Sequence, residues 1–199
     1  MASERRIGGE DSKSRAVLLD AALSLMLDEG YASVTSRKVA ARAGLKPQLV
    51  HYYFRTMDDL FLALLRRGAE HNLERQAAAL ASDQPLWALW DFSNEPAGTA
   101  LYMEFAALAN HRKAIRAEIA AYAERFRQQQ LDALSAVLAA GDGNGDDDGE
   151  ELSPVAFLVL MTAVSRTVAM EEGLGMSQGH PEAWALIERR LIELEGPRR

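Results

Sequence analysis

Residues 18–61 read LLDAALSLMLDEGYASVTSRKVAARAGLKPQLVHYYFRTMDDLF, and this stretch decides the fold. From Ser14 to Glu29 the apolar residues recur with the spacing of an amphipathic helix. Gly30 follows where a helix commonly ends, because glycine tolerates the left-handed backbone of a C-terminal cap. The pattern therefore predicts a first helix over residues 14–29.

Two shorter helices are predicted after it. Thr35 is a good N-cap for a helix over residues 36–43, and Gly44 again permits a left-handed end. Pro47 is tolerated at the first position of a helix, so a third helix is predicted over residues 47–54. A pair of short helices separated by about three residues is a helix-turn-helix candidate.

The spacing inside this pair strengthens the candidate. Ala40 lies mid-helix, where a small side chain lets two helices cross closely, and Val50 is apolar on the second helix. The remaining contacts of the buried seam are expected from Val39, Ala43, Leu45 and Tyr53. The outward set is then Lys46, Gln48, Leu49, His51 and Tyr52. It combines a cation, an amide that can pair with adenine, an apolar contact for a thymine methyl and two aromatic phosphate partners.

Residues 14–61 resemble the DNA-binding domain of TetR-family transcriptional repressors. The shared pattern is a helix followed by Gly-Tyr, Thr, Val-Ala, Ala-Gly, Tyr-Phe and acidic-Leu. The resemblance implies a homodimer whose helical body binds a small molecule and dimerises through its last two long helices. Ligand binding is then expected to move the two DNA-binding heads apart.

The resemblance also implies which residues contact DNA. They comprise a phosphate-gripping group at the start of the second helix, the recognition helix and one flanking cation: Thr35, Ser36, Arg37, Lys46, Pro47, Gln48, Leu49, His51, Tyr52 and Arg55. One departure concerns Met57, because the family commonly has a lysine before the acidic pair that opens the fourth helix. Arg55 is the candidate replacement for that phosphate contact.

Composition places the chain among globular proteins. It has 199 residues, 48% of them apolar, and its lack of cysteine excludes disulfides, thiolate metal sites and cysteine nucleophiles. The net charge of -7 is uneven, since residues 1–67 hold 11 Lys+Arg against 8 Asp+Glu and residues 68–199 hold 11 against 21. A basic head on an acidic body suits a head that meets phosphate. We expect a cytoplasmic protein with no membrane segment.

The fold class is predicted to be all-α with about nine helices. After the head, helices are expected over residues 58–82, 97–110, 112–140, 153–172 and 181–195, with a short aromatic segment around Trp87 and Trp90. The expected organisation is a flexible N-terminus (residues 1–13), a helix-turn-helix domain (14–60) and a helical ligand-binding and dimerisation domain (61–196) with a mobile acidic loop (141–151).

Other kinds of site find less support. In the acidic loop, Asp142, Asn144 and Asp146 alternate as EF-hand ligands do, but Asp147 and Ser153 stand where glycine and glutamate are needed. Gly173, Gly175 and Gly179 do not fit a dinucleotide fingerprint, and the four histidines form no metal or nucleophile motif. We expect no cofactor, no metal and no enzymatic activity.

The aromatic residues of the body are either packing or the wall of a cavity. The candidate ligand residues are Trp87, Trp90, Tyr102, Glu104, Phe105, His111, Tyr122, Phe126, Phe157 and Met161. An apolar cavity with few polar groups would suit a small apolar or amphipathic ligand. The run Asn110-His111-Arg112 could supply polar anchors, couple the body to the head, or form a cap and a charged turn.

Helical spacing also suggests a dimer interface. The candidate stripes are Leu158, Thr162, Ser165 and Val168 on one helix and Trp184, Ile187 and Leu191 on the next. Two such stripes per subunit can form a four-helix seam.

The predicted function is therefore a sequence-specific DNA-binding repressor that a small-molecule ligand releases from an inverted-repeat operator. The expected partners are duplex DNA, a second copy of the chain and an unidentified ligand. The alternative is an all-helical small-molecule-binding protein or adaptor whose helix-turn-helix is only scaffold. Salt-sensitive binding to duplex DNA separates the two.

Overall fold

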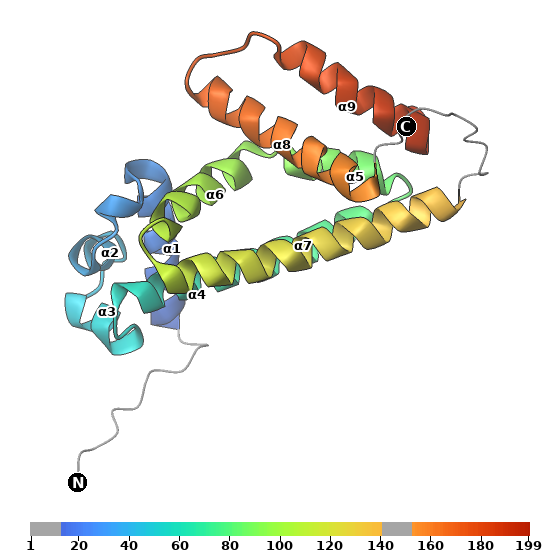
Figure 1. Ribbon diagram of the computed structural model, residues 1–199. Helices are drawn as coiled ribbons and strands as arrows, with labels where there is room; N and C mark the ends of the chain where they lie inside the picture. The colour runs from blue at the N-terminus through green and yellow to red at the C-terminus, as the bar shows by residue number, and fades with distance from the viewer. Residues whose placement is uncertain (1–12, 141–152) are drawn as a thin grey trace. The chain divides into compact units, whose positions relative to one another are not determined.

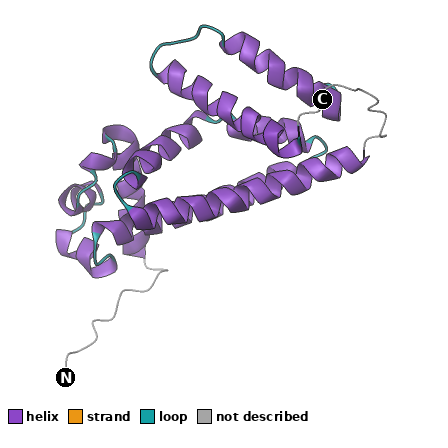
Figure 2. Cartoon of the chain, viewed as in Figure 1, coloured by secondary structure: helices purple, strands orange, loops and turns teal. Residues whose placement is uncertain are grey.

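The computed structural model describes residues 13–140 and 153–199. Within these two ranges the chain forms nine α-helices and one 3-10 helix, joined by short loops and turns, and no strand (Figures 1 and 2). The predicted all-α class with about nine helices is confirmed. The predicted flexible N-terminus, apart from Lys13, and the acidic loop over residues 141–151 lie outside the described residues.

The helices follow the predicted order and begin and end within a few residues of the predicted bounds. They are α1 (Lys13–Glu29), the 3-10 helix η1 (Tyr31–Ser33), α2 (Ser36–Arg42), α3 (Pro47–Tyr53), α4 (Met57–Leu80), α5 (Pro85–Ser93), α6 (Pro96–Ala109), α7 (Lys113–Ala140), α8 (Pro154–Gly173) and α9 (His180–Glu195).

The chain forms two compact units, and neither is continuous in sequence. Among the described residues, the head unit contains 13–70 and 101–120, whereas the body unit contains 71–100, 121–140 and 153–199. This division differs from the predicted boundary between residues 60 and 61. The reason is packing, because the first part of α4, most of α6 and the start of α7 bury apolar side chains in the core of the head unit.

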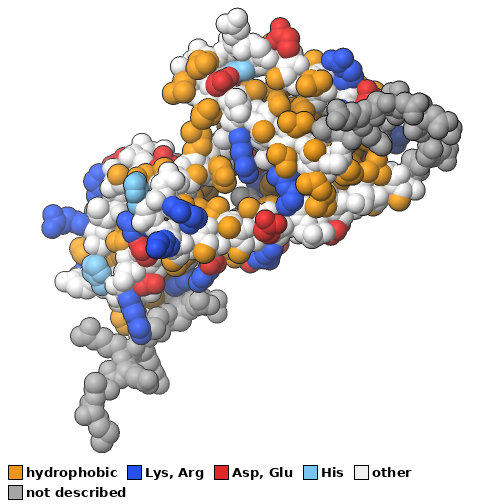
Figure 3. Space-filling view, viewed as in Figure 1, with side chains coloured by type: hydrophobic (Ala, Val, Ile, Leu, Met, Phe, Trp, Pro, Cys, Tyr) orange, Lys and Arg blue, Asp and Glu red, His pale blue; other side chains and the backbone are white. Residues whose placement is uncertain are grey.

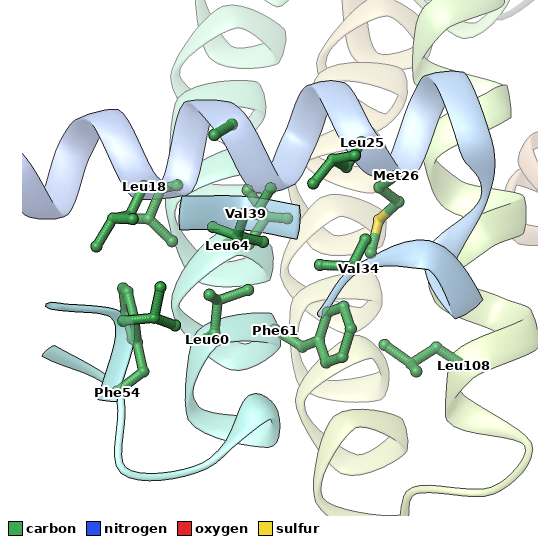
Figure 4. Close-up of a cluster of buried hydrophobic side chains, with 14 of the residues drawn as sticks. Leu18, Leu25, Met26, Val34, Val39, Phe54, Leu60, Phe61, Leu64 and Leu108 are labelled. Carbon is green, nitrogen blue, oxygen red and sulfur yellow. The ribbon is translucent and has the colours of Figure 1, made fainter. Parts of the chain in front are cut away.

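The core of the head unit joins α1–α4 to α6 and α7. Figure 4 shows its side chains converging from several helices, among them Leu18 and Met26 of α1, Val39 of α2, Phe61 of α4 and Leu108 of α6. All five are 2% exposed or less. A core of this density fixes the orientation of the short helices, which could not form stably in isolation.

The core of the body unit forms around α5. Trp87 and Trp90 of α5 pack with Leu134 of α7, with Leu158 of α8 and with residues of α9. The Trp90 ring meets the Trp184 ring edge-on, with centroids 5.8 Å apart. The carboxylate of Glu195 accepts the backbone N–H groups of Leu86 and Trp87, each at 3.1 Å, so the end of α9 caps the start of α5.

Within the described ranges, α8 is the one helix whose length and composition would let it cross a bilayer. Core helices of non-membrane proteins share this property. The inner face of α8, including Leu158 and Met161, is fully buried in the body core.

Candidate nucleic-acid interface and body site

A capped and ion-paired α2 supports the recognition helix. Thr35 Oγ1 accepts the backbone N–H of Lys38 at 3.3 Å, which confirms the predicted N-cap. Arg42 lies 2.6 Å from Asp28 and 3.0 Å from Glu29, and Lys38 lies 2.7 Å from Glu29. These two cations therefore hold α2 against the end of α1, so we do not count them among the DNA contacts.

The same contacts change the acidity of the carboxylates. Hydrogen bonds from Arg42 and then from Ser24 lower the pKa of Asp28, and the hydrogen bond from Lys38 lowers the pKa of Glu29. Both carboxylates thus stay ionised below their usual range.

The turn between α2 and α3 has the expected geometry. Ala40 is fully buried, and its carbonyl accepts the N–H of Leu45 at 2.9 Å. Gly44 has a φ of +65°, a left-handed conformation that disfavours other residues. Val50 of α3 is 1% exposed, so the α2–α3 pair is closed by burial of one face of each helix.

The opposite face of α3 is open to solvent. Lys46, Pro47, Gln48, His51 and Tyr52 are all exposed. Leu49 differs from the prediction, because it is half-buried and packs against the head core. A contact between Leu49 and a thymine methyl would therefore use only the exposed part of its side chain.

The flanking positions are also accessible. Thr35, Arg37 and Arg55 are exposed and Ser36 is half-buried. Met57 packs against the head core, which explains an apolar residue where the family commonly has a lysine.

A capping pair at the start of α4 was not predicted. The Thr56 N–H donates to Asp59 Oδ2 at 2.9 Å, and Thr56 Oγ1 accepts the Asp59 N–H at 3.1 Å. The Thr-x-x-Asp spacing is the signal that could have identified it.

Three polar contacts tie α6 and α7 to the helices of the head. The Tyr31 N–H donates to Glu104 Oε2 at 2.6 Å, Arg66 pairs with Glu118 at 2.6 Å, and Arg112 pairs with Asp58. The Arg112 guanidinium also lies 5.4 Å from the centroid of the Phe61 ring. Arg112, in the run 110–112, therefore makes its contacts within the head unit.

The candidate ligand residues do not form one group. Trp87, Trp90, Phe157 and Met161 are together in the body core, and Tyr122 and Phe126 lie half-buried on α7 of the same unit. Four others belong to the head unit: Tyr102, Glu104, Phe105 and His111.

Two of the head-unit members, Phe105 and Glu104, have structural contacts that differ from the predicted ligand role. Phe105 is 4% exposed in the head core, and Glu104 accepts the Tyr31 N–H instead of facing a ligand. Tyr102 and His111 are exposed. These residues are close together along the chain, which is why they were predicted to share one cavity. However, α6 begins in the body unit and ends in the head unit, so closeness in sequence does not place them in one core.

The residues of the predicted dimer stripes do not form an exposed surface. Five of the seven residues are buried within a single protomer: Leu158, Ser165, Val168, Ile187 and Leu191. Thr162 and Trp184 are half-buried; Thr162 donates to the Leu158 carbonyl, and Trp184 packs on the body core. The stripes are the inner faces of α8 and α9, because α5 covers them.

The exposed apolar side chains lie on other faces of the same helices. They are Val155, Val159, Leu160 and Met170 on α8 and Leu186 and Ile192 on α9. Figure 3 shows hydrophobic side chains gathered over this part of the surface.

A shallow groove of about 270 Å³ lies between α8 and the start of α9. Val164, Val168 and Ala183 line it, together with His180, whose Nε2 is 2.7 Å from Glu171 Oε2. In the described ranges no group of three or more His, Asp or Glu side chains is arranged to hold a metal ion.

A buried cluster of polar side chains in the body unit was not predicted from the sequence. Gln76 of α4 is completely buried and bonds to Gln129 and Gln130 of α7. Nearby on α7, Arg127 has a guanidinium nitrogen that is buried as well. Single polar residues inside long helices carry no sequence signal that distinguishes burial from exposure.

Comparison with known proteins supports the helix-turn-helix interpretation. The sequence profile described as "Bacterial regulatory proteins, tetR family" matches residues 18–64. The chain is also 24% identical over 184 residues to the HTH-type transcriptional regulator BetI of Rhizobium meliloti (strain 1021), a match that covers 88% of this chain and 91% of that protein.

Residues 18–64 match the TetR family. The chain is a DNA-binding transcriptional regulator.

Solved structures agree with the TetR-family fold. A transcriptional regulator from Saccharomonospora viridis, solved in complex with choline, superposes with a TM-score of 0.71 at 21% identity, covering 90% of this chain and 95% of that one. FadR from Bacillus subtilis, solved with stearoyl-CoA, superposes with a TM-score of 0.64 at 14% identity, covering 92% and 99%. Transcriptional regulators with this fold have thus been solved with chemically different ligands.

Proposed function

We propose that this TetR-family regulator is a homodimeric repressor that binds an inverted-repeat operator and leaves it when a small molecule occupies the body unit. The observation that carries the proposal is the open face of α3. Lys46, Gln48, His51 and Tyr52 are exposed on a helix whose other face is anchored by buried Val50. An α-helix fits the major groove of B-DNA, where these side chain types find partners.

We assign the DNA contacts to two groups. Gln48 and Lys46 read base edges, because a glutamine amide pairs with adenine and a lysine with guanine. Thr35, Ser36, Arg37, His51, Tyr52 and Arg55 contact phosphates, with Pro47 and Leu49 shaping the front of α3. Phosphate contacts set position and orientation, and base contacts set the preferred sequence.

The homodimer is proposed to form through the outward faces of α8 and α9. Val155, Val159 and Met170 follow helical spacing on α8, and Leu186 and Ile192 lie exposed on α9. Leu186 is 60% exposed, which is a large apolar surface to leave in water. A two-fold pair of such faces would place two heads on half-sites about 34 to 36 Å apart or a near multiple of that.

The signal from ligand to DNA is proposed to pass through α6 and α7. Both helices contribute to the head unit, where Glu104 and Arg112 contact the head directly. A ligand that shifts either helix in the body would change the position of its head contacts. The effect on DNA affinity equals the ligand's preference for the released conformation, commonly about 1 to 3 kcal/mol.

The ligand is proposed to bind in the body unit near Tyr122 and Phe126, the candidate residues there that are half-buried and outside the tight core. Two structural neighbours were solved with choline and with stearoyl-CoA, which supports a small organic ligand for this chain. We further infer that the protein acts in the cytoplasm, on DNA, without catalysing a reaction.

Selection of bound duplexes from a random pool tests the proposal. We expect an enriched inverted repeat, and binding that weakens steeply as salt rises, because phosphate contacts release counterions. Enrichment of single half-sites would contradict the dimer. Failure to retain any duplex at low salt would favour the alternative, in which the helix-turn-helix is a scaffold.

A further inference from the structure

The body unit contains a polar network that is already complete. Gln76 is 0% exposed; its Nε2 donates to the Phe126 carbonyl at 3.2 Å and to Gln129 Oε1 at 2.9 Å. Its Oε1 accepts from Gln130 Nε2 at 2.8 Å. Every polar atom of this side chain therefore has a partner, as burial requires.

Arg127, inside the same stretch of α7, is different. Its Nη1 has less than 1 Å² of exposed surface and no hydrogen-bond partner in the part of the chain that the structure describes. A buried donor without a partner is costly, and a charged one more so. Arginine cannot escape the cost by losing its proton, since guanidinium stays protonated in proteins.

The surroundings of Arg127 make the imbalance larger. Burial lowers the pKa of the Arg127 guanidinium, and the Arg166 guanidinium on α8 lowers it further. Glu124, one turn earlier on α7, acts in the opposite direction, but its effect is the smallest of the three. The charge of Arg127 is therefore opposed by that of Arg166 and only weakly offset by Glu124.

Three aromatic rings of the body unit each hold an arginine of the protein itself. Arg125 lies 4.9 Å from the Tyr122 centroid, Arg75 lies 5.3 Å from Phe92, and Arg198 lies 5.8 Å from Trp87. Open aromatic faces are what a quaternary ammonium ligand uses. These three rings therefore already hold the protein's own arginines.

We propose that the effector of this regulator carries an anionic headgroup, a carboxylate or a phosphate, which binds Arg127 Nη1 inside the body unit. The inference rests on the proposed function and defines the class of its ligand. A planar guanidinium matches both anions with two parallel hydrogen bonds. A cationic ligand such as choline would be repelled at this position.

The test measures ligand binding to the full chain without DNA. The probes are decanoate, decyl phosphate, decanol and decyltrimethylammonium, which share one apolar tail and differ in headgroup charge. Titration calorimetry gives the affinities, and thermal unfolding gives the shift in Tm that binding produces. We expect the two anions to bind and raise Tm, and to bind at least about tenfold more tightly than decanol or the ammonium compound.

Variants at Arg127 connect the binding to this side chain. R127Q should weaken the anions by about tenfold or more. R127M replaces an unpaired buried cation with an apolar side chain, so it should unfold at the same or a higher temperature than the wild type without ligand. The matched control is R189Q, which removes the same charge from an exposed position on α9 and should bind the anions like the wild type.

Three results would overturn the anion site. They are tighter binding of decyltrimethylammonium than of decanoate, equal loss of affinity in R127Q and R189Q, and a lower Tm of ligand-free R127M that shows a structural role for the charge. Operator binding is measured separately by fluorescence anisotropy. Anion binding by a chain that binds no duplex DNA would overturn the proposed function and still support the anion site.

Discussion

Gln48 is the residue whose loss should change sequence preference most. It is exposed near the start of α3, and its amide can make two hydrogen bonds to adenine. Gln48→Ala should cost about 1 to 3 kcal/mol against the preferred operator and relax discrimination at one base pair. Fluorescence anisotropy with operator and scrambled duplexes measures both effects. Equal weakening on the two duplexes would show that Gln48 does not read a base.

Arg37 provides the matched contrast on α2. Arg37→Ala should weaken binding to every duplex alike and reduce the slope of affinity against salt, because it removes one phosphate contact. The readout is the affinity at several salt concentrations for the same two duplexes. An unchanged slope would remove Arg37 from the phosphate contacts.

Trp90 is a core residue of the body unit. It is 2% exposed in the body core and meets Trp184 edge-on. Trp90→Ala should therefore destabilise the body unit by about 3 to 5 kcal/mol instead of removing a ligand contact alone. Urea unfolding measures this, and a loss below about 1 kcal/mol would contradict the core assignment.

At the scale of elements, the ion pairs between α1 and α2 predict a pH dependence. The lowered pKa values of Asp28 and Glu29 mean that their stabilising contribution is present above the usual carboxylate range near pH 4 and is lost as the pH falls through the folded values. Arg42→Gln should lower Tm at neutral pH, and the difference from the wild type should shrink below about pH 4.

The control for this prediction is Lys113→Gln, which removes an exposed cation at the start of α7. Its Tm difference from the wild type should not shrink over the same acid range. A Tm difference between Arg42→Gln and the wild type that stays constant from neutral to acid pH would contradict the role of the ion pairs between α1 and α2.

The contact between α6 and the turn after α1 should stabilise the head unit. Glu104→Ala leaves the partly buried Tyr31 N–H without its acceptor and should destabilise the head unit by about 1 to 3 kcal/mol. It should also reduce the effect of ligand on operator affinity. Met103→Ala, at an exposed position one residue earlier, is the control and should change neither urea unfolding nor ligand response.

At the scale of the whole molecule, two double substitutions separate core from interface. Val159→Asp with Leu186→Asp adds charge to the outward faces of α8 and α9. We expect folded monomers that lose operator binding, because a dimer engages two half-sites at once. Sedimentation velocity and helical circular dichroism check the two parts of this outcome. A wild-type monomer at micromolar concentration would contradict the proposed dimer.

The contrasting pair is Leu158→Asp with Ile187→Asp. Both side chains are buried in the body core, so charge there should unfold that unit, at a cost above about 4 kcal/mol. We expect this pair to lose both its helical circular dichroism signal and its operator binding. A folded monomer from this pair of substitutions would instead support the dimer interface that was predicted from helical spacing.

Local signals in the sequence were sufficient for the head. Thr35, Gly44 and Pro47 act through the backbone of their own neighbourhood, so the ends of α2 and the start of α3 follow from residue type alone. The small Ala40 and apolar Val50 likewise predict the crossing of the two helices. The exposed face of α3 could be derived in the same way, apart from the half-buried Leu49.

Tertiary structure alone decided how the body packs. α8 carries apolar residues around most of its circumference, including buried Leu158 and exposed Val159, so periodicity could not say which face meets α5 and α9. Continuous α6 puts Phe105 in the head core for the same reason. The unpaired nitrogen of Arg127 is likewise invisible in sequence. Caps and turns depend on contacts a few residues apart, whereas burial depends on which distant helices a side chain meets.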